Sequence, residues 1–207
     1  MLALCCGCAT RSISNPVRSY GGGNSTYAGE LSDFDVVGLG APTGAGRDVV
    51  LQKGMRVLVV QSGAGFPNER MLSALSAHFE VGAVSGIPTP ALSEHGMRQA
   101  AARGGFEAIV AYWGILETTE RANAGAAASW VPIAGWFVPD ADQLMRIRLR
   151  IVVLDVQTGC WRTILPEPMD DERASSMLSR ESSDRDQVEL LMQAAIPAAV
   201  ELLTKGI

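Results

Sequence analysis

The stretch MRVLVVQSGAGFPNERMLSALSAHF, residues 55–79, contains the pattern that decides the fold. It opens with an apolar, β-branched run that ends before Gly63, which is typical of a buried β-strand. Apolar residues then recur at helical spacing from Met71 onward, and Asn68 stands where the N-cap of a helix is expected. The stretch therefore predicts a strand followed by a helix, with the folded domain beginning at Met55.

The same alternation continues further along the chain. Residues 79–87 predict a second short strand, and residues 93–105 predict a helix that ends at two consecutive glycines. Residues 106–120, FEAIVAYWGILETTE, predict a third strand whose alternate side chains lie on opposite faces of a sheet. The order up to this point is β-α-β-α-β.

The pattern then changes. Residues 143–154 alternate arginines with apolar side chains, which indicates a strand with one solvated face. DVQTG, residues 155–159, predicts a hairpin turn, and residues 160–168 predict the partner strand. Residues 169–186 are polar and predict a loop or a poorly packed helix.

A long helix is predicted at the carboxyl-terminal end, over residues 184–206, with Pro197 kinking it where a backbone donor is missing. Its apolar stripe comprises Val188, Leu191, Met192, Ala195 and Leu202. The sequence therefore predicts an α/β domain over 55–207 with a mixed sheet: β-α-β-α-β, then a β-hairpin and a long carboxyl-terminal helix.

Composition narrows the class of protein. The net charge is −5, from 22 acidic and 17 basic residues, and no run of Lys or Arg appears, so nucleic acid is not an expected partner. No stretch of about 18 apolar residues predicts a membrane-spanning helix. Any membrane attachment is therefore expected to be peripheral or covalent.

Three of the four cysteines lie in LCCGCATRS, residues 4–12. A zinc site would need a second cluster or a His pair, and Cys160 is too distant in sequence to indicate a disulfide framework. The order of Leu4, Gly7 and Cys8 resembles the lipobox of bacterial lipoproteins, in which the cysteine is acylated and becomes the mature amino terminus. This resemblance makes Cys8 the expected lipidation site.

If the lipobox interpretation holds, residues 1–54 comprise two segments with different roles. Residues 1–8 are expected to be the remnant of a signal peptide and its lipobox, with the recorded start inside the true signal peptide. Residues 9–54 are rich in Gly, Ser, Asn and Thr and predict a flexible tether. The alternative is a cytosolic protein whose cysteine-rich start is a chance feature.

Two motifs, GGFEAIVAYWG and DVQTGCW, extend the resemblance to the domain itself. They are similar to a set of bacterial envelope lipoproteins whose domains resemble the amino-terminal domain of the Tol-Pal periplasmic propeller protein and the periplasmic domain of the curli-secretion lipoprotein. The resemblance implies anchoring, assembly or partner binding in the envelope, with an envelope protein or a second copy of the chain as partner. It carries over no catalytic residues, cofactor or metal.

The turn SGAGFPNE, residues 62–69, is a candidate site for binding an anion or a nucleotide. It joins a strand to a helix, where dinucleotide-binding turns lie, but it lacks the third glycine of that motif. A plain turn is the simpler interpretation. The alternative is a small enzyme or an anion- or nucleotide-binding domain that uses Gly63, Gly65, Asn68 and Glu69, with the amides of the last two facing the anion.

AGAAASWVPIAGWFVPD, residues 124–140, is apolar and carries no charge before its last residue. One interpretation packs its aromatic side chains over the core. The other exposes them to lipid headgroups or a neighbouring subunit, since Trp is favoured at membrane interfaces. The residues predicted to make that contact are Trp130, Ile133, Trp136 and Phe137.

The predicted function is that of a lipid-anchored, non-enzymatic periplasmic protein that assembles with or binds an envelope partner. Ala9 rather than Asp follows Cys8, which by analogy with lipoprotein sorting places the palmitate-bearing anchor in the outer membrane, on its periplasmic face. No G-x-S-x-G motif is present to indicate a hydrolase.

Overall fold

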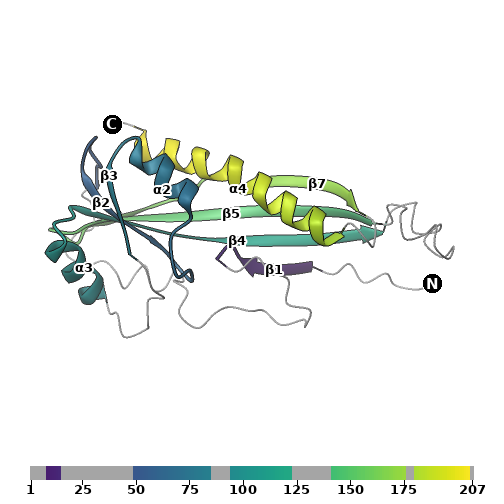
Figure 1. Ribbon diagram of the computed structural model, residues 1–207, viewed down its shortest axis with the longest axis horizontal. Coiled ribbons are helices and arrows are strands. Elements are labelled where there is room, and N and C mark those ends of the chain that lie inside the picture. The colour runs from purple at the N-terminus through teal and green to yellow at the C-terminus, as the bar shows by residue number, and fades with distance from the viewer. Residues whose placement is uncertain (1–7, 15–48, 85–93, 123–140, 176–179, 206–207) are drawn as a thin grey trace.

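The computed structural model describes residues 8–14, 49–84, 94–122, 141–175 and 180–205. Over these residues the chain forms one mixed sheet of seven strands with helices on both faces (Figure 1). The predicted fold class, α/β with a mixed sheet and a long carboxyl-terminal helix, is confirmed.

Strands and helices alternate along the first half of the described chain, and strands dominate the second half until the last helix. In chain order the elements are β1 (Cys8–Ser12), β2 (Arg56–Gln61), α2 (Glu69–Ser76), β3 (Glu80–Ala83), α3 (Glu94–Arg103), β4 (Ala108–Ala122), β5 (Ala141–Asp155), β6 (Trp161–Ile164), β7 (Met169–Ser175) and α4 (Arg180–Thr204).

The spine of the sheet is the antiparallel pair β4–β5, whose register runs from Ala108 opposite Asp155 to Ala122 opposite Ala141. The end of the spine at Ala122 and Ala141 is called the hairpin end below, and the end at Ala108 and Asp155 the parallel end. At the parallel end β2 lies parallel to β4, β3 lies parallel to β2, and β6 pairs with β5. Towards the hairpin end β1 pairs with β4 and β7 pairs with β5, both antiparallel.

The main core lies between the sheet and two helices, α2 and α4, which cover the same face (Figure 1). It is built from the inward-facing residues of β2, β4 and β5, such as Val59, Val110 and Ile151, against Met71 of α2 and Leu191 of α4. A smaller core under α3 covers the other face at the parallel end. Because alternate side chains of the long strands lie on opposite faces of the sheet, one set packs against α2 and α4 and the other against α3.

Local chemistry accounts for the ends of the elements. The side chain of Asn68 accepts a hydrogen bond from the Arg70 amide at 2.9 Å and caps α2 as predicted. α3 is followed by Gly105 at φ +72°, and the predicted turn after β5 contains Gly159 at φ +74°. Asp155 closes that turn by accepting from the Thr158 amide at 2.6 Å.

The prediction of a loop or poorly packed helix over 169–186 was wrong for residues 169–175. Residues 169–175 form the strand β7, and α4 begins at Arg180. One carboxylate of this polar strand pairs with β5: Arg146 donates to Asp170 through Nε at 2.6 Å and through the terminal nitrogen at 3.0 Å. A bidentate pair of this kind fixes the register of two half-solvated strands.

The apolar stripe of α4 was predicted correctly except at its end. Leu202 is 38% exposed, whereas Leu203 is 1% exposed and belongs to the main core. The reason is helical spacing, because Ala195, Ala199 and Leu203 follow one another at intervals of four and lie on one face.

The described parts of residues 9–54 belong to the folded domain. Residues 9–12 pair with β4, and Val49 and Leu51 are buried in the main core. The Ile13 amide donates to the Gly114 carbonyl at 3.0 Å, and a Cβ atom at Gly114 would lie 3.1 Å from the Ile13 side chain and 2.8 Å from the Arg148 carbonyl oxygen. Residues 15–48 lie outside the described part of the chain, and the tether predicted there stays a prediction.

Candidate functional site

The predicted lipidation site lies at the start of a paired strand. Cys8 is the first residue of β1, and its register partner is Thr119 of β4. From Thr119 it is three residues to Ala122 at the hairpin end, or ~10 Å along an extended strand. An acyl group on Cys8 would therefore leave the molecule beside the hairpin end, with no free residue between the lipid and the sheet.

The predicted anion-binding turn contains a closed hydrogen-bond network. Tyr112 of β4 donates its hydroxyl proton to Gln61 Oε1 at 2.6 Å. The Asn68 amide donates to the same Gln61 oxygen at 2.8 Å and to the Tyr112 hydroxyl at 2.9 Å. Gln61 in turn donates through Nε2 to Ser14 Oγ at 3.1 Å, and Ser14 donates to the Ser62 carbonyl at 2.5 Å. The network ties the ends of β1 and β2 to the start of α2.

Burial controls the protonation of this network. Tyr112 is fully buried, and burial raises the pKa of its phenol well above the ordinary value, while the hydrogen bond from the Asn68 amide acts weakly in the opposite direction. The phenol therefore keeps its proton at neutral pH and serves as donor to Gln61 and acceptor from Asn68.

The four residues predicted for the anion site are brought to one turn, but their groups are not equally available. The Asn68 amide is already donated inside the protein, and Gly63 takes the left-handed conformation, φ +76°, that shapes the turn. Gly65 and Glu69 are exposed. The Glu69 carboxylate lies in the first turn of α2, where its negative charge interacts favourably with the helix dipole and would repel a bound anion. These contacts favour the plain-turn interpretation, and anion binding stays a prediction.

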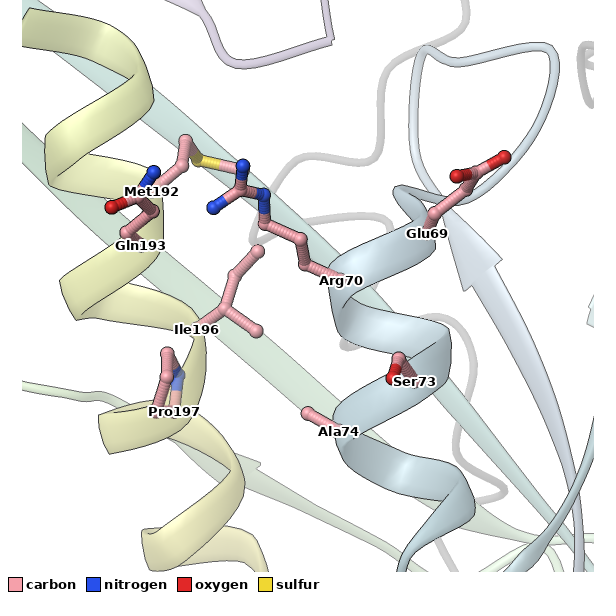
Figure 2. Close-up of a pocket in the computed structure, with 8 residues that line it drawn as sticks. All are labelled: Glu69, Arg70, Ser73, Ala74, Met192, Gln193, Ile196 and Pro197. Carbon is pink, nitrogen blue, oxygen red and sulfur yellow. The ribbon is translucent and has the colours of Figure 1, made fainter.

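A groove of about 450 Å³ lies between α2 and α4 (Figure 2). Its walls come from four residues of each helix: Glu69, Arg70, Ser73 and Ala74 of α2, and Met192, Gln193, Ile196 and Pro197 of α4. Figure 2 shows the side chains of Ala74 and Ile196 pointing into the space between the two helices.

Polar groups lie along the edge of this groove. Arg70 forms an ion pair with Glu189, which joins α2 to α4. Pro197 has no backbone N–H, so it cannot donate the helical hydrogen bond to the carbonyl of Gln193, four residues earlier. The groove thus combines an apolar interior with an arginine and a glutamine at its edge.

The sequence alone did not reveal the groove or the network. The groove depends on which faces of α2 and α4 meet, and their separation in the chain hides that contact. Gln61 did carry a signal, because it is a polar residue at the end of an otherwise apolar, buried strand, and such a residue needs a partner.

The remaining predicted contact residues, Trp130, Ile133, Trp136 and Phe137, lie outside the described residues. The segment that carries them is joined at its two ends to Ala122 and Ala141, the pair that closes the hairpin end.

Within the described ranges, no group of three or more His, Cys, Asp or Glu side chains is arranged to hold a metal ion. Cys160 is a buried, free thiol. None of the described helices is both long enough and apolar enough to cross a membrane.

Comparison with known proteins decides the family. The sequence model of the YafT bacterial lipoproteins matches residues 29–206, which is most of the chain. The chain belongs to the YafT bacterial lipoprotein family. It is therefore a lipid-anchored protein of the bacterial envelope, and the predicted lipoprotein character is confirmed by a match that does not include Cys8.

Other comparisons add less to this family assignment. No curated protein matches the chain. A PelC variant dodecamer from Paraburkholderia phytofirmans is similar over 74% of this chain and 94% of its own, at 10% identity and a TM-score of 0.27. The hypothetical protein CT253 from Chlamydia trachomatis covers 74% of this chain and 99% of its own, at 13% identity and a TM-score of 0.34. At these TM-scores neither likeness carries an argument, and the predicted likeness to the Tol-Pal and curli-secretion domains stays a prediction.

Proposed function

We propose that this YafT-family lipoprotein is acylated at Cys8 and acts, without catalysis, as a component that binds another protein in the envelope. The observation that carries the proposal is the position of Cys8 as the first residue of a paired strand in a chain of a lipoprotein family. An acyl anchor there holds the whole sheet at the membrane through backbone hydrogen bonds.

The membrane in this proposal is the outer membrane, with the domain on its periplasmic face. Ala9 follows Cys8, and a residue other than Asp at this position agrees with sorting to the outer membrane. The anchor supplies the membrane attachment, since none of the described helices is suited to span a bilayer.

The groove between α2 and α4 is the proposed site for the protein partner. Met192 and Ile196 form the buried floor of the groove, and half-buried Ala74 and exposed Pro197 are the apolar groups that a partner side chain would cover. Arg70 and Gln193, both exposed at the edge, each donate to Glu189 within the protein, and their remaining N–H groups are the donors that a partner segment would meet.

Site-specific photocrosslinking in living cells tests this groove. A photoreactive residue replaces Ser73 in the groove. In a matched variant it replaces Gln99, an exposed residue of α3, which packs on the opposite face of the sheet. The proposal expects a discrete crosslinked species from position 73 and none from position 99. A species with twice the mass of the chain would make the partner a second copy, and absence of any species at 73 or equal yields at both positions would reject the groove.

A further inference from the structure

We infer that residues 184–190 of α4 form a flap that opens from the sheet separately from the rest of the helix, and that its opening releases one edge of the groove between α2 and α4. The inference concerns the wall of the groove and not what binds there. It rests on contacts within the described protein, so it can fail without affecting the proposed partner binding.

The side chains that α4 buries change in character along the helix. In the flap the buried residues are Asp184 and Gln187, which are polar, and Val188 packs against the main core but is only half-buried. The buried residues that follow are all apolar: Leu191, Met192, Ala195, Ile196, Ala199, Val200 and Leu203. The later turns therefore gain a stabilisation from apolar burial that the flap largely lacks.

The sheet beneath the flap is polar as well. Thr118 of β4 lies opposite Met145 of β5, and Gln143 lies two residues from Met145, so both share the face of that main-core residue. Gln143 is 0% exposed and Thr118 is 3% exposed. Gln187 donates through Nε2 to the Gln143 carbonyl at 3.3 Å, which places the flap above these two residues, towards the hairpin end (Figure 1).

The polar side chains between the flap and the sheet are poorly matched to one another. Within the described protein no hydrogen-bond partner is present for either amide atom of the Gln143 side chain, for Gln187 Oε1 or for Thr118 Oγ1. Buried polar groups in folded proteins are normally paired, and burial of an unpaired group is unfavourable. Separation of the flap from the sheet hydrates these groups, so the flap opens at a lower free-energy cost than the turns after it.

Opening of the flap acts on the groove through Glu189. This residue lies in the flap and forms the ion pair with Arg70 that joins α4 to α2. Met192 and Ile196, which line the groove, lie after the flap and belong to the main core. Opening therefore breaks the contact at the edge of the groove while its apolar floor stays in place.

Hydrogen exchange followed by mass spectrometry tests the flap in the full chain. Peptides that cover residues 184–190 and 191–203 are compared at neutral pH after correction for their intrinsic exchange rates. We expect exchange about ten-fold faster or more in residues 184–190, because their opening does not require the main core to separate. Equal protection of the two peptides would overturn the inference.

A double variant distinguishes the flap from ordinary fraying at the end of a helix. Gln143→Leu with Gln187→Leu replaces the unpaired amides by apolar side chains and is expected to slow exchange of residues 184–190 several-fold, with α2 unchanged. Gln99→Leu, at an exposed position on α3, is the matched control and should leave residues 184–190 unchanged. Exchange of 184–190 that is as fast in the double variant as in wild type would mean fraying alone and would reject the flap.

A milder variant covers the case in which the double variant does not fold. Thr118→Val has nearly the same shape and removes one buried hydroxyl that has no partner. It should slow exchange of residues 184–190 in the same direction, by less than the double variant. Wild-type or faster exchange of these residues in Thr118→Val would contradict the role given to the polar floor.

Discussion

Cys8 is the register partner of Thr119, so the proposed acylated residue is also part of the sheet. A lipoprotein with a long tether can turn freely above its membrane, whereas a lipid on a paired strand transmits the position of the bilayer to the whole domain. The anchor and the distance of the α2–α4 groove from the membrane both depend on that pairing.

The first prediction concerns the anchor itself. Cys8→Ala is expected to abolish acylation and to move the protein from the membrane fraction to the soluble periplasmic fraction, because Cys8 is the cysteine that follows the small residue Gly7, as in a lipobox. Cys6→Ala is the matched control and is expected to leave the membrane fraction unchanged. Fractionation of cells that express each variant gives the result, and loss of membrane association in the Cys6 variant alone would assign the anchor to Cys6.

The second prediction concerns the buried network at the strand-to-helix turn. Tyr112→Phe removes the donor to Gln61 and an acceptor for the Asn68 amide, so the free energy of unfolding should fall by about 1–3 kcal/mol. Ser73→Ala on exposed α2 is the control and should change it by less than about 0.5 kcal/mol. Urea unfolding measures both, and a neutral effect of Tyr112→Phe would mean that the network contributes nothing to stability.

The same tyrosine predicts a pH dependence. The folded state raises the pKa of Tyr112 above 10.0, so the unfolded chain loses the phenol proton first as the pH rises. The Tyr112 contribution to stability is therefore complete below about pH 10 and declines above it. Wild type should lose more stability than Tyr112→Phe between about pH 9 and about pH 11. Parallel losses in the two proteins would contradict the shift.

The third prediction tests the register of α4. Leu203→Ala removes a side chain from the main core and is expected to cost about 2–5 kcal/mol of unfolding free energy. Leu202→Ala, its exposed neighbour, is expected to cost less than about 1 kcal/mol. The two variants share their chemistry and their place near the helix end, so equal losses in urea unfolding would show that the helix packs in another register.

The fourth prediction concerns the pair that joins β5 to β7. Hydrogen bonds from Arg146 hold the pKa of the Asp170 carboxyl below its ordinary value of 3.8. Arg146→Gln should raise that pKa towards the ordinary value, whereas Arg103→Gln on α3 should leave it unchanged. Carboxyl NMR titration measures the pKa directly. If the Asp170 pKa were the same in Arg146→Gln as in wild type, the pair would not persist in solution.

The sign of the corresponding stability effect follows from the lowered pKa. The contribution of Asp170 is present above the ordinary pKa and is lost as the pH falls through the folded-state pKa. As the pH falls below the ordinary pKa, wild type should therefore lose slightly more stability than the Arg146→Gln variant, because the exposed pair contributes little.

The sequence predicted the helices and strands that have a strong apolar pattern. It missed the strands that form only because they pair with another strand. β2, β4 and α2 have apolar periodicity strong enough to identify them without a partner. β7, with the sequence MDDERAS, has no such periodicity, because one face is solvated and its order comes from backbone pairing with β5 and from the Arg146–Asp170 pair. The acidic residues 170–172, which follow a strand that carries Arg146, were the available signal for β7.

At the strand-to-helix turn, the sequence predicted the helix cap but not the contacts around it. Asn68 was correctly identified as the cap of α2, but no sequence pattern reveals that Tyr112 and Gln61 occupy its amide. The pairing of CATRS with β4 was equally hidden, since five residues without apolar alternation carry no strand signal. Contacts between distant segments decide both features.

The most direct test of an anchor at Cys8 is the mass of the amino-terminal peptide of the native protein, purified from envelope membranes. We predict a peptide that begins at Cys8 and carries diacylglycerol on its sulfur, with a fatty acyl group on the new amino terminus. An unmodified peptide that begins at Met1 would contradict the anchor at Cys8 and, with it, the proposed attachment of the sheet to the membrane.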